Sequence, residues 1–228
     1  YLAYGSNLSM AQMAQRCPDA IYVGTAEIKE AVTEEAARRF AQGESVQVLS
    51  PYNNKGNLSA YALNMAIRDR VNPLERGKIV LKRDKDSFRD NDRVIILQND
   101  RERNCSNGDV GIFHILKVEE KRVTYCVELP DGRCPTWDDA SGLAQLSLAY
   151  CLTVHKSQGS EYDTILLPIA KGMDGMLSRN LLYTAISRAK KRVILYGDPQ
   201  ALDVAVQKNL PQRKSLLVPK TRMLLECA

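Results

Sequence analysis

The stretch LAYCLTVHKSQGSEYD, residues 148–163, begins as an apolar run and ends in a cluster of polar side chains. It is followed by a second apolar segment at residues 164–169 and by a third at residues 192–196. Apolar strands that alternate with helices are typical of a mostly parallel sheet covered on both faces. The sequence therefore predicts an α/β domain in which residues 146–154 form one strand. The accompanying helices are predicted over residues 180–189 and 199–207.

A β-rich region precedes this segment. Three stretches rich in β-branched and aromatic residues are separated by the turn-forming dipeptides Asn107-Gly108 and Asp131-Gly132. This pattern favours antiparallel strands joined by tight turns. The strands are predicted over residues 92–97, 109–118 and 122–129. The region is therefore predicted to be a small antiparallel barrel or meander.

Two further elements lie upstream of the β-rich region. Residues 45–50 favour a buried strand, and residues 60–71 place Leu63, Ile67 and Val71 on one helical face. The simplest arrangement is an α/β domain interrupted by the β region. Its predicted boundaries are residues 46–81 and 143–228 for the α/β domain, and residues 82–142 for the insertion.

Composition excludes several classes of protein. The 228 residues are 44% hydrophobic and 26% charged, with a formal net charge of +5, which is ordinary for a soluble globular chain. The apolar runs are far shorter than the roughly 20 residues of a membrane-spanning helix, so no membrane partner is expected. Six cysteines without a CxxC pair, and only two histidines, favour reduced thiols and no metal site. With no secretion signal evident, the expected location is cytoplasmic.

The polar cluster after residue 152 is the candidate site. At the carboxyl edge of a parallel sheet, loop amides, hydroxyls and a cation converge on phosphate groups. Gly159 permits a close approach of the backbone to such a ligand. From the residue types alone, however, His155 and Lys156 fit a solvated loop equally well.

Two segments resemble motifs of superfamily 1 helicases. LTVHKSQGSEYD, residues 152–163, resembles motif V, particularly in the RecD-like branch, and LLYTAISRAKKRVIL, residues 181–195, resembles motif VI at the expected distance. The resemblance implies that Arg188 is the catalytic arginine finger, which reaches the γ-phosphate of ATP between two RecA-like domains. It further implies that Gly159 and Glu161 line the nucleotide side. The residues implied to face the backbone of single-stranded DNA are Thr153, His155, Lys156 and Ser157.

Two more segments agree with this family. Residues 46–73 resemble motif IV and its following helix, and residues 92–116 resemble the entry into the inserted SH3-like barrel. The implied fold is a RecA-like parallel-sheet domain of the P-loop NTPase type with that small β-barrel inserted. Asn53 and Asn54 stand where many relatives carry an arginine, so no nucleotide contact is expected from motif IV. Residues 107–109 are expected to form a tight turn rather than a DNA contact.

Two motor motifs do not occur in these 228 residues: a GxxxxGK[ST] phosphate loop and an acidic motif that holds Mg²⁺. The expected cofactor, ATP with Mg²⁺, therefore requires a partner domain or subunit that carries the Walker A and B motifs. Hydrolysis by these residues alone is not expected. The expected function is that of a C-terminal motor module of an ATP-dependent RecD-like DNA helicase. The alternative is a DNA-binding remnant with no nucleotide role.

The first 28 residues carry a second resemblance. YLAYGSNLSMAQMAQRCPDAIYVGTAEI is similar to the opening of γ-glutamylcyclotransferase-like (AIG2-like) proteins, in which the YGSN loop binds the γ-glutamyl group. No residue here matches the catalytic glutamate of that family, so an enzyme of this kind is the least favoured function. Residues 29–45 are predicted to be a connecting helix.

Overall fold

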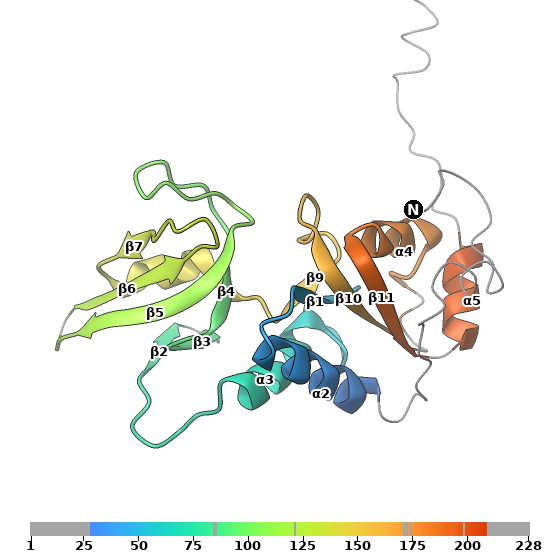
Figure 1. The fold of residues 1–228 in the computed structure, drawn as a ribbon, viewed down its shortest axis with the longest axis horizontal. Coiled ribbons are helices and arrows are strands. Elements are labelled where there is room, and N and C mark those ends of the chain that lie inside the picture. Colours follow the sequence, from blue (N-terminus) through green and yellow to red (C-terminus); the bar gives the residue numbers. More distant parts are fainter. Residues whose placement is uncertain are drawn as a thin grey trace, which may run out of the picture.

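The computed structural model describes residues 28–83, 86–120, 122–170, 173, 175–197 and 199–208. These residues form two lobes that lie side by side (Figure 1). One lobe is built on a four-stranded sheet in the order β11-β10-β1-β9, and the other on a five-stranded sheet in the order β7-β6-β5-β4-β8. The first sheet is parallel and the second antiparallel, which confirms the predicted α/β fold with an inserted β region.

The parallel lobe has helices on both faces of its sheet. Its strands are β1 (Val46–Ser50), β9 (Cys151–Thr153), β10 (Tyr162–Ile169) and β11 (Ala189–Gly197). Its helices are α2 (Ile28–Ala41), α3 (Ala60–Val71), α4 (Arg179–Ile186) and α5 (Pro199–Gln207). In Figure 1, α2 and α3 lie below the sheet, and α4 lies on the other side of β11. Covered on both faces, β1 is buried along its whole length, as expected for a central parallel strand.

The antiparallel lobe is organised around aromatic side chains. Its strands are β4 (Arg93–Ile96), β5 (Val110–Val118), β6 (Val123–Glu128), β7 (Thr136–Trp137) and β8 (Leu146–Leu148), with a separate hairpin of β2 (Val80–Arg83) and β3 (Asp86–Arg89) and a 3-10 helix at Ala140–Gln145. Phe88, Phe113, Tyr125 and Trp137 form a continuous series with ring centroids 5.2–5.7 Å apart. These rings supply the apolar centre that a small barrel needs.

The prediction of a single strand over residues 146–154 is wrong. Leu146–Leu148 pairs antiparallel with β4, whereas Cys151–Thr153 pairs parallel with β1. Ala149 and Tyr150 link the two strands, so the apolar run crosses from one lobe to the other. Both halves are apolar because each is buried in the core of its own lobe. The helix predicted over residues 180–189 also ends early, at Ile186, and residue 189 already belongs to β11.

A buried polar network fixes the crossing between the lobes. The Tyr150 hydroxyl donates to Asp92 Oδ1 at 3.1 Å, and Asn72 Nδ2 donates to the same oxygen at 2.8 Å. The backbone N–H of Arg89 donates to Asp92 Oδ2 at 2.8 Å. Asp92 has no exposed surface, and burial raises the pKa of its carboxyl group. Because Tyr150 belongs to the linker and Asp92 to the β lobe, these bonds set how the lobes lie.

Some predictions fall at or beyond the limits of the described residues. The 1–28 fragment lies outside them except for Ile28, the first residue of α2, and residues 209–228 also lie outside. The helix predicted over residues 29–45 corresponds to α2, which buries Val32 and Ala36. The domain boundaries themselves stay predictions.

Two structural features are absent from the described part of the chain. There, no helix has the length and apolar character to cross a bilayer. Among the same residues, no group of three or more His, Cys, Asp or Glu side chains is placed to hold a metal ion. The four cysteines that are described are free thiols.

Candidate functional site

Motif V begins at the carboxyl end of β9, where two buried hydroxyls hold its turn. The Thr153 hydroxyl accepts from the Lys156 backbone N–H at 3.3 Å, and the Ser157 hydroxyl donates to the Val154 carbonyl at 2.8 Å. Ser157 has no exposed surface, and Thr153 is 9% exposed. Both side chains therefore shape the turn in this structure rather than facing solvent.

His155 and Lys156 project from the same turn into solvent. Within the described part of the chain, neither side chain makes a hydrogen bond or ion pair. Their charge and ring nitrogens are therefore available to an external ligand. Of the four residues predicted to contact DNA, His155 and Lys156 are the two whose side chains are exposed and free to bind a ligand.

Gly159 and Glu161 lie near the other end of the loop. Gly159 has a φ of +88°, a conformation that L side chains rarely adopt, and a Cβ built there would meet no atom within 4 Å. Open space therefore borders the backbone at this point. Glu161 is exposed and forms an ion pair with Lys190 at 3.6 Å.

Arg188 follows α4 and lies against the motif V loop. Helix α4 begins with Ser178, whose hydroxyl accepts from the Leu181 N–H, a typical N-cap. Past the other end of this helix, Arg188 Nη1 donates to the Ser160 carbonyl at 3.4 Å and Nε donates to the Thr184 carbonyl at 3.3 Å. The Arg188 backbone carbonyl accepts from the Tyr162 N–H at 2.9 Å, so motifs V and VI are joined directly.

Arg188 also has no carboxylate partner among the described residues. Its third side-chain bond, from Nη2 to the Ser187 hydroxyl at 3.1 Å, is again to a neutral acceptor. The guanidinium is half-buried and fully charged, yet it is held only by neutral oxygens. An arrangement of this kind orients the cation while leaving its charge uncompensated.

The predicted site residues divide between opposite edges of the sheet. Thr153 is level with Ser50 at the carboxyl ends of β9 and β1, whereas Tyr162 is level with Ala189 at the amino ends of β10 and β11. The two edges are about 20 Å apart, since six residues of β10 separate them at ~3.3 Å each. The expectation that the whole cluster lies at the carboxyl edge is therefore wrong. His155 and Lys156 lie near that edge, Glu161 and Arg188 lie near the amino edge, and Gly159 lies in the turns that connect them.

The turn predicted over residues 107–109 is present. Gly108 has a φ of +100°, the Asp109 backbone N–H donates to the Ser106 carbonyl at 3.1 Å, and the Asp109 carboxylate accepts from the Ser106 N–H at 2.9 Å. These contacts are internal to the barrel turn. They agree with a structural role.

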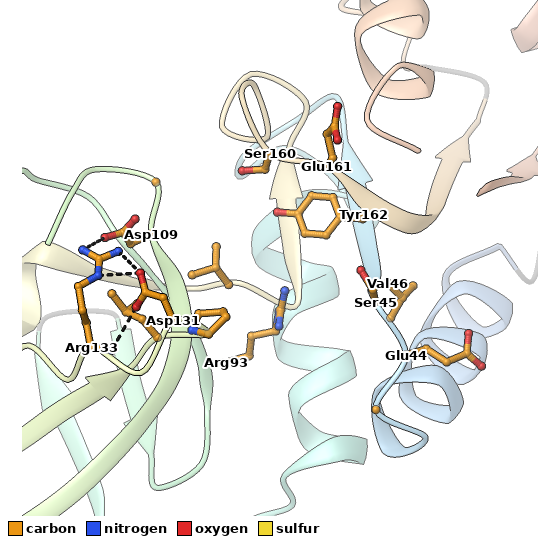
Figure 2. Close-up of a pocket in the computed structure, with 15 residues that line it drawn as sticks. Glu44, Ser45, Val46, Arg93, Asp109, Asp131, Arg133, Ser160, Glu161 and Tyr162 are labelled. Atoms are coloured by element: carbon orange, nitrogen blue, oxygen red, sulfur yellow. Dashed lines mark hydrogen bonds and ion pairs between the residues drawn. The ribbon is translucent and has the colours of Figure 1, made fainter. Parts of the chain in front are cut away.

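A cleft of about 690 Å³ between the lobes was not anticipated from the sequence. It lies next to the amino edge of the parallel sheet, and Arg93 projects into it from β4 (Figure 2). The sequence predicts Arg93 only as part of the strand at residues 92–97. Its position as the cation at the start of an otherwise apolar run, RVII, is the one signal in the sequence that marks it.

Comparisons with known proteins match two regions of the chain to helicase domains. Residues 148–196 match the UvrD-like helicase C-terminal domain, and residues 63–128 match the SH3 domain of ATP-dependent RecD-like DNA helicases. This chain contains a RecD-like superfamily 1 DNA helicase region. Both motif segments lie within the first match, and strands β2 to β6 lie within the second.

Relatives of this helicase region are longer proteins. The chain is 35% identical over 178 residues to the ATP-dependent RecD2 DNA helicase of Deinococcus radiodurans, which covers 78% of this chain and 24% of that protein. It is 26% identical to the RecBCD enzyme subunit RecD of Haemophilus influenzae, covering 77% of this chain and 25% of that protein. The chain thus spans about a quarter of the length of each of these relatives.

Similar solved structures include Pif1 helicases. The Bacteroides Pif1 helicase in complex with ADP-AlF3 and single-stranded DNA aligns with a TM-score of 0.47 and 16% identity, over 79% of this chain and 45% of that chain. The Pif1 helicase from Candida albicans aligns with a TM-score of 0.45 and 16% identity, over 88% of this chain and 58% of that chain.

Proposed function

We propose that this chain is the C-terminal motor module of an ATP-dependent DNA helicase. In this proposal, Arg188 contacts ATP, and the motif V turn contacts single-stranded DNA. The observation that carries the proposal is the uncompensated Arg188 guanidinium, held by neutral oxygens beside the motif V loop. Hydrolysis requires a Walker A and B domain, which supplies the phosphate loop.

The nucleotide side of the proposal rests on the fit of the residues to a triphosphate. A half-buried arginine without a carboxylate partner attracts phosphate strongly, because its fork of donors matches phosphate oxygens. Its present bonds are 3.1–3.4 Å long and go to neutral acceptors, so they cost little to exchange for phosphate. The open space at Gly159 leaves room for the nucleotide next to the backbone.

The cofactor Mg²⁺ is assigned to the partner domain. Magnesium prefers carboxylates and phosphate oxygens, and the described residues hold no cluster of ligands for it. Glu161, the one acidic residue of the motif V loop near Arg188, is paired with Lys190. The role proposed for this chain is therefore to place a cation against the nucleotide, while the partner holds the metal.

The DNA side of the proposal rests on the turn at residues 153–157. Thr153 and Ser157 hold the turn from inside, and His155 and Lys156 extend from it to meet the strand. A cation and a ring at an exposed turn suit the sugar-phosphate backbone better than base edges. Binding that is independent of base sequence and sensitive to salt is therefore expected.

The Lys156→Ala variant tests the DNA side. Removing one phosphate contact is expected to weaken binding of a poly-dT oligonucleotide and to reduce the slope of log K against log [salt] by roughly 0.7–1. Fluorescence anisotropy at several salt concentrations gives both quantities. The matched control is Lys191→Ala, since Lys191 is also exposed in this lobe but is paired with Asp163 at 2.8 Å. An unchanged slope in Lys156→Ala, or equal changes in both variants, would place Lys156 off the DNA path.

A further inference from the structure

The cleft between the lobes holds a cation that the proposed function does not use. The cleft is bordered on one side by residues 43–46 and 160–162 of the parallel lobe, and on the other by residues 108–110 and 129–131 of the barrel. Arg93, the first residue of β4, extends into this space (Figure 2). Neither Arg188 nor Lys156 lines it.

The Arg93 guanidinium is half-buried and has no counter-ion among the described residues. It stacks over the Phe40 ring at 5.6 Å, and its Nε atom is shielded from solvent and has no hydrogen-bond partner. Among the residues that the structure describes, no carboxylate lies within ion-pair distance of it. Burial lowers the pKa of Arg93, and the nearby Tyr162 and Tyr150 partly oppose this effect. Arginine nevertheless stays protonated in proteins. A buried permanent charge of this kind is unfavourable unless an anion pairs with it.

The carboxylates that line the cleft do not compensate Arg93, because each has a cationic partner elsewhere. The pairs are Glu44 with Arg39 at 2.6 Å, Asp131 with Arg133 at 2.7 Å, Asp109 with Arg133 at 3.5 Å, and Glu161 with Lys190 at 3.6 Å. Asp109 and Asp131 share the single guanidinium of Arg133, and Arg39 pairs with both Glu44 and Glu35, so the acidic side chains outnumber their cationic partners. Arg93 is the one guanidinium lining the cleft that has no ion pair with a described residue.

Hydroxyl groups accompany Arg93 in the cleft. Figure 2 shows the Tyr162 ring with its hydroxyl directed toward the barrel and the Ser160 side chain beside it. The Ser160 side chain lies within hydrogen-bonding reach of Tyr162, and burial raises the pKa of the Tyr162 phenol, so it remains a proton donor at neutral pH. Phosphate oxygens accept hydrogen bonds from guanidinium and hydroxyl groups, so this set of donors suits a phosphate.

We propose that the cleft between the two lobes binds a phosphate-bearing ligand, with Arg93 as its counter-ion and the hydroxyls of Tyr162 and Ser160 as further donors. The volume of about 690 Å³ suits a ligand of nucleotide size. The phosphate belongs either to a free nucleotide or to a nucleic-acid strand, since both present the same oxygens. The cleft adjoins the contacts proposed for Arg188, because Ser160, whose carbonyl accepts from Arg188, also lines the cleft, whereas Arg188 and Lys156 themselves do not line it.

The test is calorimetric titration of the purified full chain with three probes: inorganic phosphate, ADP and a dT oligonucleotide. Arg93→Gln removes the charge but keeps a polar side chain, and is expected to weaken binding of at least one probe tenfold or more. Loss for ADP alone identifies a nucleotide as the ligand, and loss for the oligonucleotide identifies a strand. Arg133→Gln is the matched control, because Arg133 also lines the cleft but is already paired with two carboxylates; a change within twofold is expected.

Three further variants keep the outcome interpretable. Tyr162→Phe removes only a hydroxyl, and is expected to weaken the same probe about threefold to tenfold even if Arg93→Gln disturbs folding. Arg188→Ala and Lys156→Ala address the proposed function instead, and Arg93-dependent binding is expected to persist in both. The inference is overturned if wild-type chain binds none of the probes, if Arg93→Gln and Tyr162→Phe both bind like wild type, or if Arg133→Gln loses as much as Arg93→Gln.

Discussion

Arg188→Ala is expected to lower ATP hydrolysis by about 10³-fold or more in a motor that contains this chain, in line with the loss of an arginine finger. The affinity for single-stranded DNA is expected to stay within about twofold, because the finger acts on charge that develops in the transition state. The structural reason is location. Arg188 lies at the amino edge of the parallel sheet, whereas the exposed part of the motif V turn lies near the carboxyl edge.

The measurement needs a Walker A and B domain, which the longer relatives offer. We would replace the matching segment of the Deinococcus radiodurans helicase with residues 46–208 of this chain and measure ATP turnover with and without DNA. Arg179→Ala is the matched control: Arg179 is the first residue of α4, the helix that precedes Arg188, and its Nε donates to the Val206 carbonyl at 2.9 Å. The proposed role of Arg188 is wrong if its variant retains turnover near that of the control, or if DNA affinity and turnover fall together.

Asp92→Ala is expected to destabilise the chain by about 3–5 kcal/mol, the range found when one partner of a buried charged network is removed. The substitution leaves the Asn72 amide, the Tyr150 hydroxyl and the Arg89 N–H without their acceptor in a region closed to water. Because these groups come from both sides of the crossing, the lobes are also expected to lose their fixed arrangement. Urea unfolding followed by tryptophan fluorescence, with Trp137 in the barrel core as the probe, measures the effect.

Tyr150→Phe provides the comparison for Asp92. It removes a single hydroxyl from the same network while keeping the ring that packs edge-on against Phe40, and is expected to cost about 1–1.5 kcal/mol. One ordinary hydrogen bond contributes ~1 kcal/mol. If the free energy of unfolding of Asp92→Ala lies within that amount of the wild-type value, the network does not fix the crossing between the lobes.

Local sequence patterns predicted the individual elements well. The helix predicted over residues 60–71 is α3 with those bounds, since Leu63 and Ile67 are both fully buried on the face where the spacing placed them. The tight turn at residues 107–109 followed from Asn107-Gly108, because glycine adopts positive φ without strain. Signals of this kind depend on a few neighbouring residues, so they can be recognised without knowledge of the fold.

Features that depend on which strand or lobe a segment packs against could not be predicted from the sequence. The run at residues 146–154 is apolar throughout, and nothing in it reveals that Leu146–Leu148 and Cys151–Thr153 join different sheets. The burial of Ser157 depends on the turn that its hydroxyl closes onto Val154, and serine in a polar run gives no sign of it. The isolation of Arg93 depends on two lobes meeting, because carboxylates nearby in space are already paired with other cations.

The measurement that tests the central claim most directly is a structure of the same hybrid helicase with ADP, aluminium fluoride and single-stranded DNA. Arg188 is expected to leave the Ser160 and Thr184 carbonyls, with its guanidinium about 2.7–3.0 Å from the aluminium fluoride, at charge-assisted hydrogen-bond distance. Lys156 is expected to lie against a DNA phosphate at the opposite edge of the sheet. An Arg188 side chain that still donates to the two carbonyls, with the nucleotide bound and closed in by the partner domain, would contradict the proposed role of Arg188.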